Sequence, residues 1–209
     1  MPTVGCADPV PPSAAPGSVT PHGGDPPPAA PARTPAWHEA TRLQRGRVPV
    51  AVQSWLLADG SLTAHVRARC VRGFRLRVLR QQRACPRRDE ARALGVAAGR
   101  PALVREVALC DGAFPLVVAR TVLPFASLRG PGTRFAALGR RPLGALLFAT
   151  RSAQRGSFAL ACLDPRQAGV APPPGAVGRV WGRRAVFRVA GAPMLVSEFF
   201  LPALFRTKA

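Results

Sequence analysis

The chain has 209 residues, and its 30 Lys+Arg against 10 Asp+Glu give a formal net charge of +20. This length allows one ordinary domain or two very small ones, and one domain of this size needs neither disulfides nor metals for stability. No apolar run reaches the roughly 18 residues of a membrane span, and no signal peptide begins the chain, so we expect a cytoplasmic protein without membrane insertion.

The N-terminal residues differ in composition from the rest of the chain. Residues 1–36 consist mainly of Pro, Ala, Gly and Ser and contain 11 of the 24 prolines. They have almost no large apolar side chains, so burial cannot offset the entropy lost on ordering them. We predict a disordered leader over 1–36 and a single folded domain over 37–209.

Apolar periodicity, prolines and glycines divide the predicted domain into short elements. In chain order they predict helices over 49–56 and 61–69, a strand over 73–78, a helix over 89–94, strands over 102–110 and 114–123, short helices over 134–138 and 142–149, a strand over 157–163, a Pro-rich loop at 172–174, and strands over 183–189 and 193–201. In the first strand, the alternation of apolar and basic residues predicts that Phe74, Leu76 and Val78 face the core.

Two glycine-containing turns set the predicted topology. Asp111-Gly112-Ala113 and Ala190-Gly191-Ala192 each lie between two β-rich segments, which is a hairpin signal. The six predicted strands come mostly in hairpins, with helices between them. We therefore expect an α+β fold, a six-stranded antiparallel sheet with helices packed on one face.

Two charged residues occupy apolar faces of predicted strands. Counting by two places Arg105 on the face of Leu103, Val107 and Leu109. The same counting places Glu198 with three other residues on one face of the last strand: Met194, Val196 and Phe200. A charge in such a place costs several kcal/mol unless it is paired or hydrogen-bonded.

The spacing leaves two interpretations of these charges open. Arg105 and Glu198 form a structural ion pair, or each is satisfied by a nearer neighbour, as Arg105 would be by Glu106 at an edge. Alternatively, both face an apolar ligand pocket, where the guanidinium binds a carboxylate bidentately and the glutamate meets a hydroxyl or a C–H proton.

The cysteines and histidines do not form a metal-binding pattern. The five cysteines are widely spaced, with no C-x-x-C pair, and the three histidines are not near them in metal-ligand spacing. The sequence therefore predicts reduced thiols and no structural zinc site.

Seven short segments between Trp37 and Phe205 follow one another in a familiar order and spacing. They are Trp55-Leu-Leu, Asp59-Gly-Ser-Leu-Thr63, Val104-Arg-Glu-Val107, Ala119-Arg-Thr-Val122 with Pro124, Leu138-Gly139 with Pro142-Leu-Gly144 and Leu147-Phe148, Trp181-Gly-Arg-Arg184, and Leu195-Val-Ser-Glu-Phe-Phe-Leu-Pro202. Together they resemble the chorismate pyruvate-lyase family, bacterial enzymes that make 4-hydroxybenzoate for ubiquinone. Each segment alone is weak, but seven in order make a chance match improbable.

The resemblance implies a monomeric, cofactor-free lyase with an internal site under helical flaps. Arg105 stands where the family's arginine binds the ring carboxylate, and Glu198 where its glutamate meets the region of the 4-hydroxyl. Leu62 and Leu143 match flap and loop positions that contact the ligand, and Arg120 matches a second basic position near the ligand channel. The segment Asp164–Val177 looks like an insertion.

The implied reaction eliminates enolpyruvate from chorismate with loss of the C4 hydrogen, and formation of the aromatic ring drives it. The protein has to hold the substrate in a reactive geometry and bind its carboxylates in a water-poor pocket. Glu198 acts either as a general base or as a group that orients the hydroxyl while the enol ether takes the hydrogen.

Two other functions are alternatives. A non-catalytic sensor of the same fold, as in the effector domains of one family of bacterial transcription regulators, would bind a small carboxylate; residues 1–36 are too short and Pro-rich for the winged helix-turn-helix of such regulators. A basic RNA-binding domain would show exposed aromatics among its basic residues, yet the chain has no Tyr. We therefore expect no nucleic-acid partner.

Overall fold

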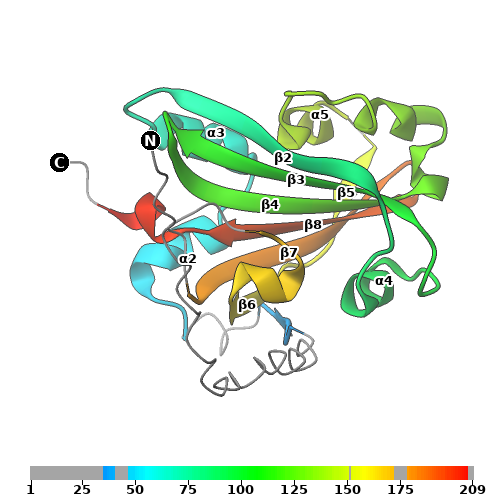
Figure 1. Cartoon of the computed structure of the whole chain (residues 1–209), viewed down its shortest axis with the longest axis horizontal. Helices are drawn as coiled ribbons and strands as arrows, with labels where there is room; N and C mark the ends of the chain where they lie inside the picture. Colours follow the sequence, from blue (N-terminus) through cyan, green and yellow to red (C-terminus); the bar gives the residue numbers. More distant parts are fainter. Residues whose placement is uncertain (1–34, 41–46, 151, 172–177, 207–209) are drawn as a thin grey trace, which may run out of the picture. The chain divides into compact units, whose positions relative to one another are not determined.

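Eight antiparallel strands form one sheet in the part of the chain that the structure describes, as Figure 1 shows for its central strands. The order across the sheet is β1-β6-β7-β8-β4-β3-β2, and β5 pairs with β7. The strands are β1 (His38–Glu39), β2 (Phe74–Ala84), β3 (Ala102–Asp111), β4 (Phe114–Pro124), β5 (Ala153–Arg155), β6 (Ala159–Leu163), β7 (Val180–Val189) and β8 (Ala192–Phe200).

The computed structural model describes residues 35–40, 47–150, 152–171 and 178–206, all within the unit Ala32–Ala209. The helices are α2 (Val50–Leu56), α3 (Leu62–Arg69), α4 (Arg88–Leu94) and α5 (Leu143–Ala149), with 3-10 turns η1 (Phe125–Leu128), η2 (Gly130–Phe135), η3 (Pro165–Ala168) and η4 (Pro202–Phe205). No described helix is long and apolar enough to cross a membrane. Most of the predicted leader, and the prolines at 172–174, lie outside the described residues.

Both predicted hairpins are present at their glycine turns. The β3–β4 turn contains Gly112 with a φ of 59°, and the β7–β8 turn contains Ala190 and Gly191 with φ of 49° and 80°. Two consecutive residues with positive φ are what a type I′ hairpin turn requires. The two hairpins join edge to edge, because β4 pairs with β8.

The prediction of α+β architecture with an antiparallel sheet is confirmed, but the predicted number of six strands is wrong. The two additional strands, β1 and β5, have two and three residues. Segments this short contain too few residues to show a period-two pattern, and only pairing with β6 and β7 defines them as strands.

Helices cover both faces of the sheet, so the expectation of helices on one face is also wrong. On the face of Leu109 and Val117, the sheet packs against α2 and α3. On the opposite face, Leu94 of α4 packs against Val104 and Leu195. The carboxylates of α4 hold it there through ion pairs with arginines of that face.

Three local predictions also differ from the structure. Leu76 is buried as predicted, but Val78, which precedes a register shift of β2 against β3, is 39% exposed. The residues predicted as a helix over 134–138 form the end of η2 and a turn. Within the presumed insertion, η3 and the buried Val170 pack against the sheet rather than forming only a loop.

Candidate functional site

One face of the central strands carries a cavity between the sheet and α3 and α5. In the strand register, Arg105 lies opposite Thr121, and Glu198 lies opposite Ala119 on the other edge of β4. Strand spacing puts the Cα atoms of Arg105 and Glu198 about 12 Å apart. Both residues line the same cavity. Counting by two places each on an apolar strand face but does not itself choose between a ligand pocket and a structural ion pair.

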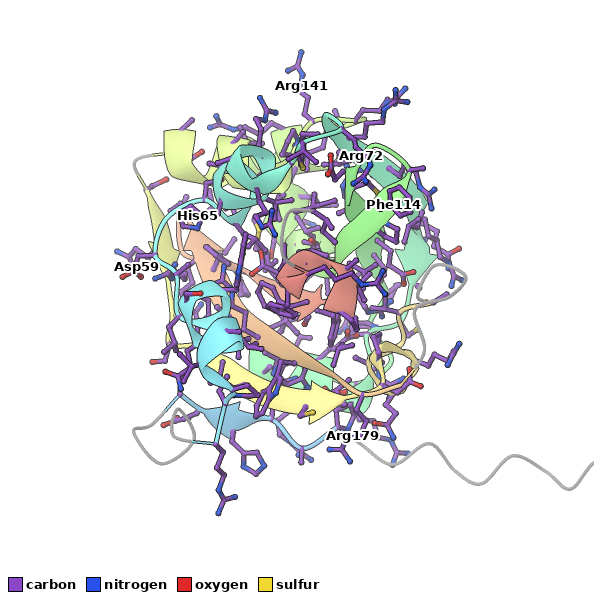
Figure 2. The ribbon with its side chains drawn as sticks, turned by 90° about the vertical axis from the view of Figure 1, so that its left-hand side faces the viewer. Asp59, His65, Arg72, Phe114, Arg141 and Arg179 are labelled. Atoms are coloured by element: carbon purple, nitrogen blue, oxygen red, sulfur yellow. The ribbon has the colours of Figure 1, made fainter. Side chains whose placement is uncertain are left out.

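Arg105 is a buried cation whose described partners are all neutral. It is 2% exposed, and its guanidinium donates to Gln81 Oε1 at 2.6 Å and to the carbonyl oxygens of Gly139 at 2.8 Å and Arg141 at 3.5 Å. The Arg141 side chain itself extends outward from the molecule (Figure 2). Burial lowers the pKa of Arg105. At least two of the five guanidinium N–H donors therefore remain for a ligand.

Glu198 is paired with an arginine that the sequence analysis did not single out. Arg183 Nε donates to Glu198 Oε2 at 2.7 Å, while Glu198 Oε1 accepts no hydrogen bond from a described residue. The Glu198 side chain is 19% exposed and lines the cavity. Glu106 pairs with Arg120 instead. Both proposed structural pairs, Arg105 with Glu198 and Arg105 with Glu106, are therefore absent among the described ion pairs.

Arg183 also connects the sheet with the end of α2. Its Nη1 donates to the carbonyl oxygens of Trp55, Leu56 and Ala58 at 2.9 to 3.2 Å. Trp55 and Leu56 belong to the last turn of α2, and Ala58 follows the helix. Backbone carbonyl oxygens at a helix C-terminus have no hydrogen-bond partner within the helix. One guanidinium thus fixes the Glu198 carboxylate and the start of the turn between α2 and α3.

The remainder of the cavity wall is largely apolar. Leu62, at the start of α3, and Leu143, at the start of α5, both line the cavity. Further apolar lining comes from strands of the sheet and from the segment between β5 and β6: Leu76, Val107, Leu109, Phe158, Phe187 and Val196. Low polarity around Arg105 and Glu198 strengthens any charge interaction made there.

Arg120 lies on the opposite face of the sheet from the cavity. Its neighbours along β4, Ala119 and Thr121, line the cavity, and successive side chains of a strand point to opposite faces. Arg120 instead donates to Glu90 and Glu106 at 2.7 Å each. Burial lowers the pKa of Arg120, but hydrogen bonds and charges from these two carboxylates outweigh it and raise the pKa. The structure does not bring Arg120 to the other predicted site residues.

A third arginine, Arg155 at the end of β5, also lines the cavity, and its side chain is 26% exposed. Its Nη2 lies 2.6 Å from Asp59 Oδ1, and its guanidinium lies 4.4 Å from the centre of the Phe158 ring. Figure 2 shows Asp59 on the outside of the molecule, at the turn between α2 and α3. Sequence reasoning missed Arg155 and gave Arg183 no role, although Arg183 falls within the motif Trp181-Gly-Arg-Arg184.

Comparisons with known proteins identify the family. The profile described as "Chorismate lyase" matches residues 32–209. A "Probable chorismate pyruvate-lyase" of Methylococcus capsulatus is 47% identical over 155 residues, which are 73% of this chain and 96% of that protein. A protein of the same name from Aromatoleum aromaticum is 43% identical over 169 residues, 78% of this chain and 91% of that protein.

Solved structures show a more distant likeness. PhnF from Mycobacterium smegmatis has a TM-score of 0.49 and 19% sequence identity, with coverage of 73% of this chain and 68% of that chain. A likeness at this level carries no functional argument. The family profile covers most of the chain, and the two relatives exceed 40% identity over nearly their whole lengths. The chain therefore belongs to the chorismate lyase family.

Proposed function

We propose that this protein removes pyruvate from chorismate to give 4-hydroxybenzoate, the first committed step toward ubiquinone. The observation that carries the proposal is Arg105, a buried guanidinium with only neutral described partners, facing an apolar cavity that also holds Glu198. A buried cation of this kind gains a charge-assisted, bidentate partner when a carboxylate enters. Membership of the chorismate lyase family is the reason for naming chorismate as the substrate.

In the proposed complex, Arg105 binds the ring carboxylate and Glu198 faces the 4-hydroxyl. Glu198 Oε1 accepts no hydrogen bond from a described residue, so it is available to the hydroxyl, while Arg183 holds Oε2. Leu62 and Leu143 close the apolar wall around the ring. The reaction then breaks the C3–O bond of the ether and the C4–H bond of the ring. The released enolpyruvate gains a proton at its terminal carbon and becomes pyruvate.

The protein's contribution to this reaction is orientation and charge stabilisation. The ring's gain of aromaticity supplies the driving force, so the site needs to hold the ether, the hydroxyl and the C4 hydrogen in a reactive arrangement. Fixed donors in a water-poor cavity stabilise developing charge without reorganising. The proposal also includes a monomeric, cytoplasmic enzyme that works without a cofactor and binds 4-hydroxybenzoate as its product.

Incubation of the purified protein with chorismate tests the proposal. We expect equimolar 4-hydroxybenzoate, followed by absorbance, and pyruvate, followed by a coupled assay. Glu198→Ala is expected to lower kcat roughly hundredfold through loss of orientation. Arg105→Ala is expected to weaken 4-hydroxybenzoate binding by about 2–5 kcal/mol, since it leaves the ligand's buried carboxylate unpaired.

The same experiment separates the enzyme from the sensor. Tight binding of 4-hydroxybenzoate by the wild-type protein without any turnover of chorismate would identify a carboxylate sensor. Wild-type affinity for 4-hydroxybenzoate in Arg105→Ala would contradict the assignment of Arg105, whichever function is correct.

A further inference from the structure

The charges that line the cavity do not balance. Three guanidiniums, those of Arg105, Arg155 and Arg183, line the cavity together with the single carboxylate of Glu198. Glu198 compensates Arg183 through the 2.7 Å ion pair. Arg105 has only neutral described partners. An excess of two positive charges suits a ligand with two negative charges better than a ligand with one.

Arg155 has an anionic partner, but this partner is readily replaced. The Asp59 side chain is 89% exposed, while that of Arg155 is 26% exposed. An ion pair with so exposed a carboxylate contributes little to stability, because water solvates the carboxylate nearly as well after it leaves. A carboxylate entering the cavity can therefore take the place of Asp59 on Arg155.

The surroundings of Arg155 help to hold its guanidinium at the wall of the cavity. Phe158 contacts two guanidiniums at 4.4 and 4.5 Å from its ring centre, those of Arg155 and Arg183. The ring orients Arg155 by a cation–π contact, and the neighbouring positive charge of Arg183 favours an anion near both groups. A second, more open depression shares four lining residues with the cavity: Gly60, Leu147, Arg155 and Phe187.

We propose that Arg155 binds the second carboxylate of the substrate, the one on the three-carbon fragment that leaves, in exchange for Asp59. This inference rests on the proposed function. Arg105 and Arg155 then hold the two carboxylates of chorismate from two positions on the wall of the same cavity. 4-Hydroxybenzoate has a single carboxylate and engages Arg105 alone. Arg155 thus distinguishes the substrate from the aromatic product, and Asp59 returns to it when pyruvate leaves.

The variant Arg155→Gln tests this assignment. We expect kcat/KM for chorismate to fall roughly tenfold or more, mainly through KM, because a charge-assisted contact to the substrate is lost. The Kd of 4-hydroxybenzoate is expected to stay within about twofold of wild type, because the product makes no contact with Arg155. Arg155→Lys keeps the charge and is expected to recover part of the loss.

Arg166→Gln is the matched control. Arg166 forms a surface ion pair with Asp164 at 3.2 Å and does not line the cavity, so its loss is expected to change neither constant. An effect of Arg155→Gln no larger than that of Arg166→Gln would overturn the proposal. Equal weakening of chorismate and 4-hydroxybenzoate would overturn it as well, because Arg155 would then not separate the two ligands.

Failure of the proposed function is visible separately. If wild-type protein does not turn chorismate over, that function is wrong, and equilibrium binding of chorismate and 4-hydroxybenzoate to wild type and Arg155→Gln still tests Arg155. A selective loss of chorismate affinity in the variant supports the second-carboxylate assignment in that case. Loss of neither affinity contradicts it.

Discussion

Two buried arginines lie on opposite faces of the central strands and differ in what surrounds them. Arg105 is held by an amide and by carbonyl oxygens, whereas Arg120 is held by two carboxylates that are themselves 3% exposed. Removing the cation from a buried ion pair leaves an uncompensated buried charge, while removing a cation from neutral partners does not. The two arginines should therefore contribute to stability in different ways.

Replacing each arginine by methionine measures this difference. We expect Arg120→Met to lower the free energy of unfolding by about 3–5 kcal/mol, since Glu90 and Glu106 lose their partner. Arg105→Met is expected to lower it by less than about 1.5 kcal/mol, because only hydrogen bonds to neutral groups are lost and a buried charge disappears with them. Urea denaturation of both variants checks this, and equal losses would contradict the proposed division between the two faces.

The sequence predicts which face of its own strand each charged residue occupies, but not which residues of other strands it meets. Counting by two along β3 and β8 correctly puts Arg105 and Glu198 on the faces that line the cavity. The partners of these charges depend on which strands become neighbours, and no local pattern contains that information. Glu198 therefore pairs with Arg183, from the strand beside its own, and not with Arg105.

The β7–β8 hairpin contains an alanine where the turn favours another residue. Ala190 has a φ of 49°, which a β-carbon makes unfavourable, and Gly191 follows it with a φ of 80°. Asparagine tolerates this left-handed conformation better than alanine, and Asn-Gly is a preferred pair in two-residue hairpin turns. This turn joins the strands that carry Arg183 and Glu198.

Ala190→Asn is therefore expected to raise the free energy of unfolding by about 0.5–1 kcal/mol. Ala113→Asn is the matched control, because Ala113 occupies the turn between β3 and β4 without a positive φ. Urea denaturation of both variants measures the difference. A gain of the same size at Ala113 would show that the effect does not come from the left-handed conformation.

The elements with strong local signals were predictable, and those that depend on tertiary contacts were not. The glycine turns at 112 and 191 and the prolines at 49 and 142 mark the hairpins and the starts of α2 and α5 correctly. Strands β1 and β5 exist through pairing alone. Val78 is 39% exposed although its spacing predicts a core position, and the register shift that follows it against β3 is not visible in the sequence of β2.

At the scale of the whole molecule, the composition leaves the cysteine thiols as the main side chains that titrate in mildly alkaline solution. The chain has no Tyr and one lysine, Lys208, so between about pH 8 and pH 10 few groups other than cysteines change charge. Burial raises the pKa of Cys110. Burial, and then the nearby Asp111 and Cys110, raise the pKa of Cys70.

Stability is expected to decline in alkaline solution as a result. Below about pH 7.5 both thiols stay protonated in the folded and the unfolded chain, so they contribute no pH dependence. Above about pH 8 the unfolded chain loses these protons first, and the free energy of unfolding falls by up to about 1.4 kcal/mol per pH unit for each thiol.

Urea denaturation at several pH values measures this slope. Cys110→Ala is expected to flatten it, because one of the two thiols with a raised pKa is gone. Cys85→Ala, at an exposed thiol, is the matched substitution and is expected to leave the slope as in wild type. An unchanged slope in Cys110→Ala would contradict the attribution to this thiol.

Strand β4 has a consequence for how this chain tolerates changes in length. Ala119 and Thr121 face the cavity, while Arg120 between them joins the buried carboxylates on the other face. Inserting or deleting one residue in this strand would exchange the two sets, placing the carboxylate-pairing arginine in the cavity and small residues against two buried acids. Combinatorial libraries of this protein should therefore vary residue identity within β3, β4 and β8 and restrict insertions to their turns.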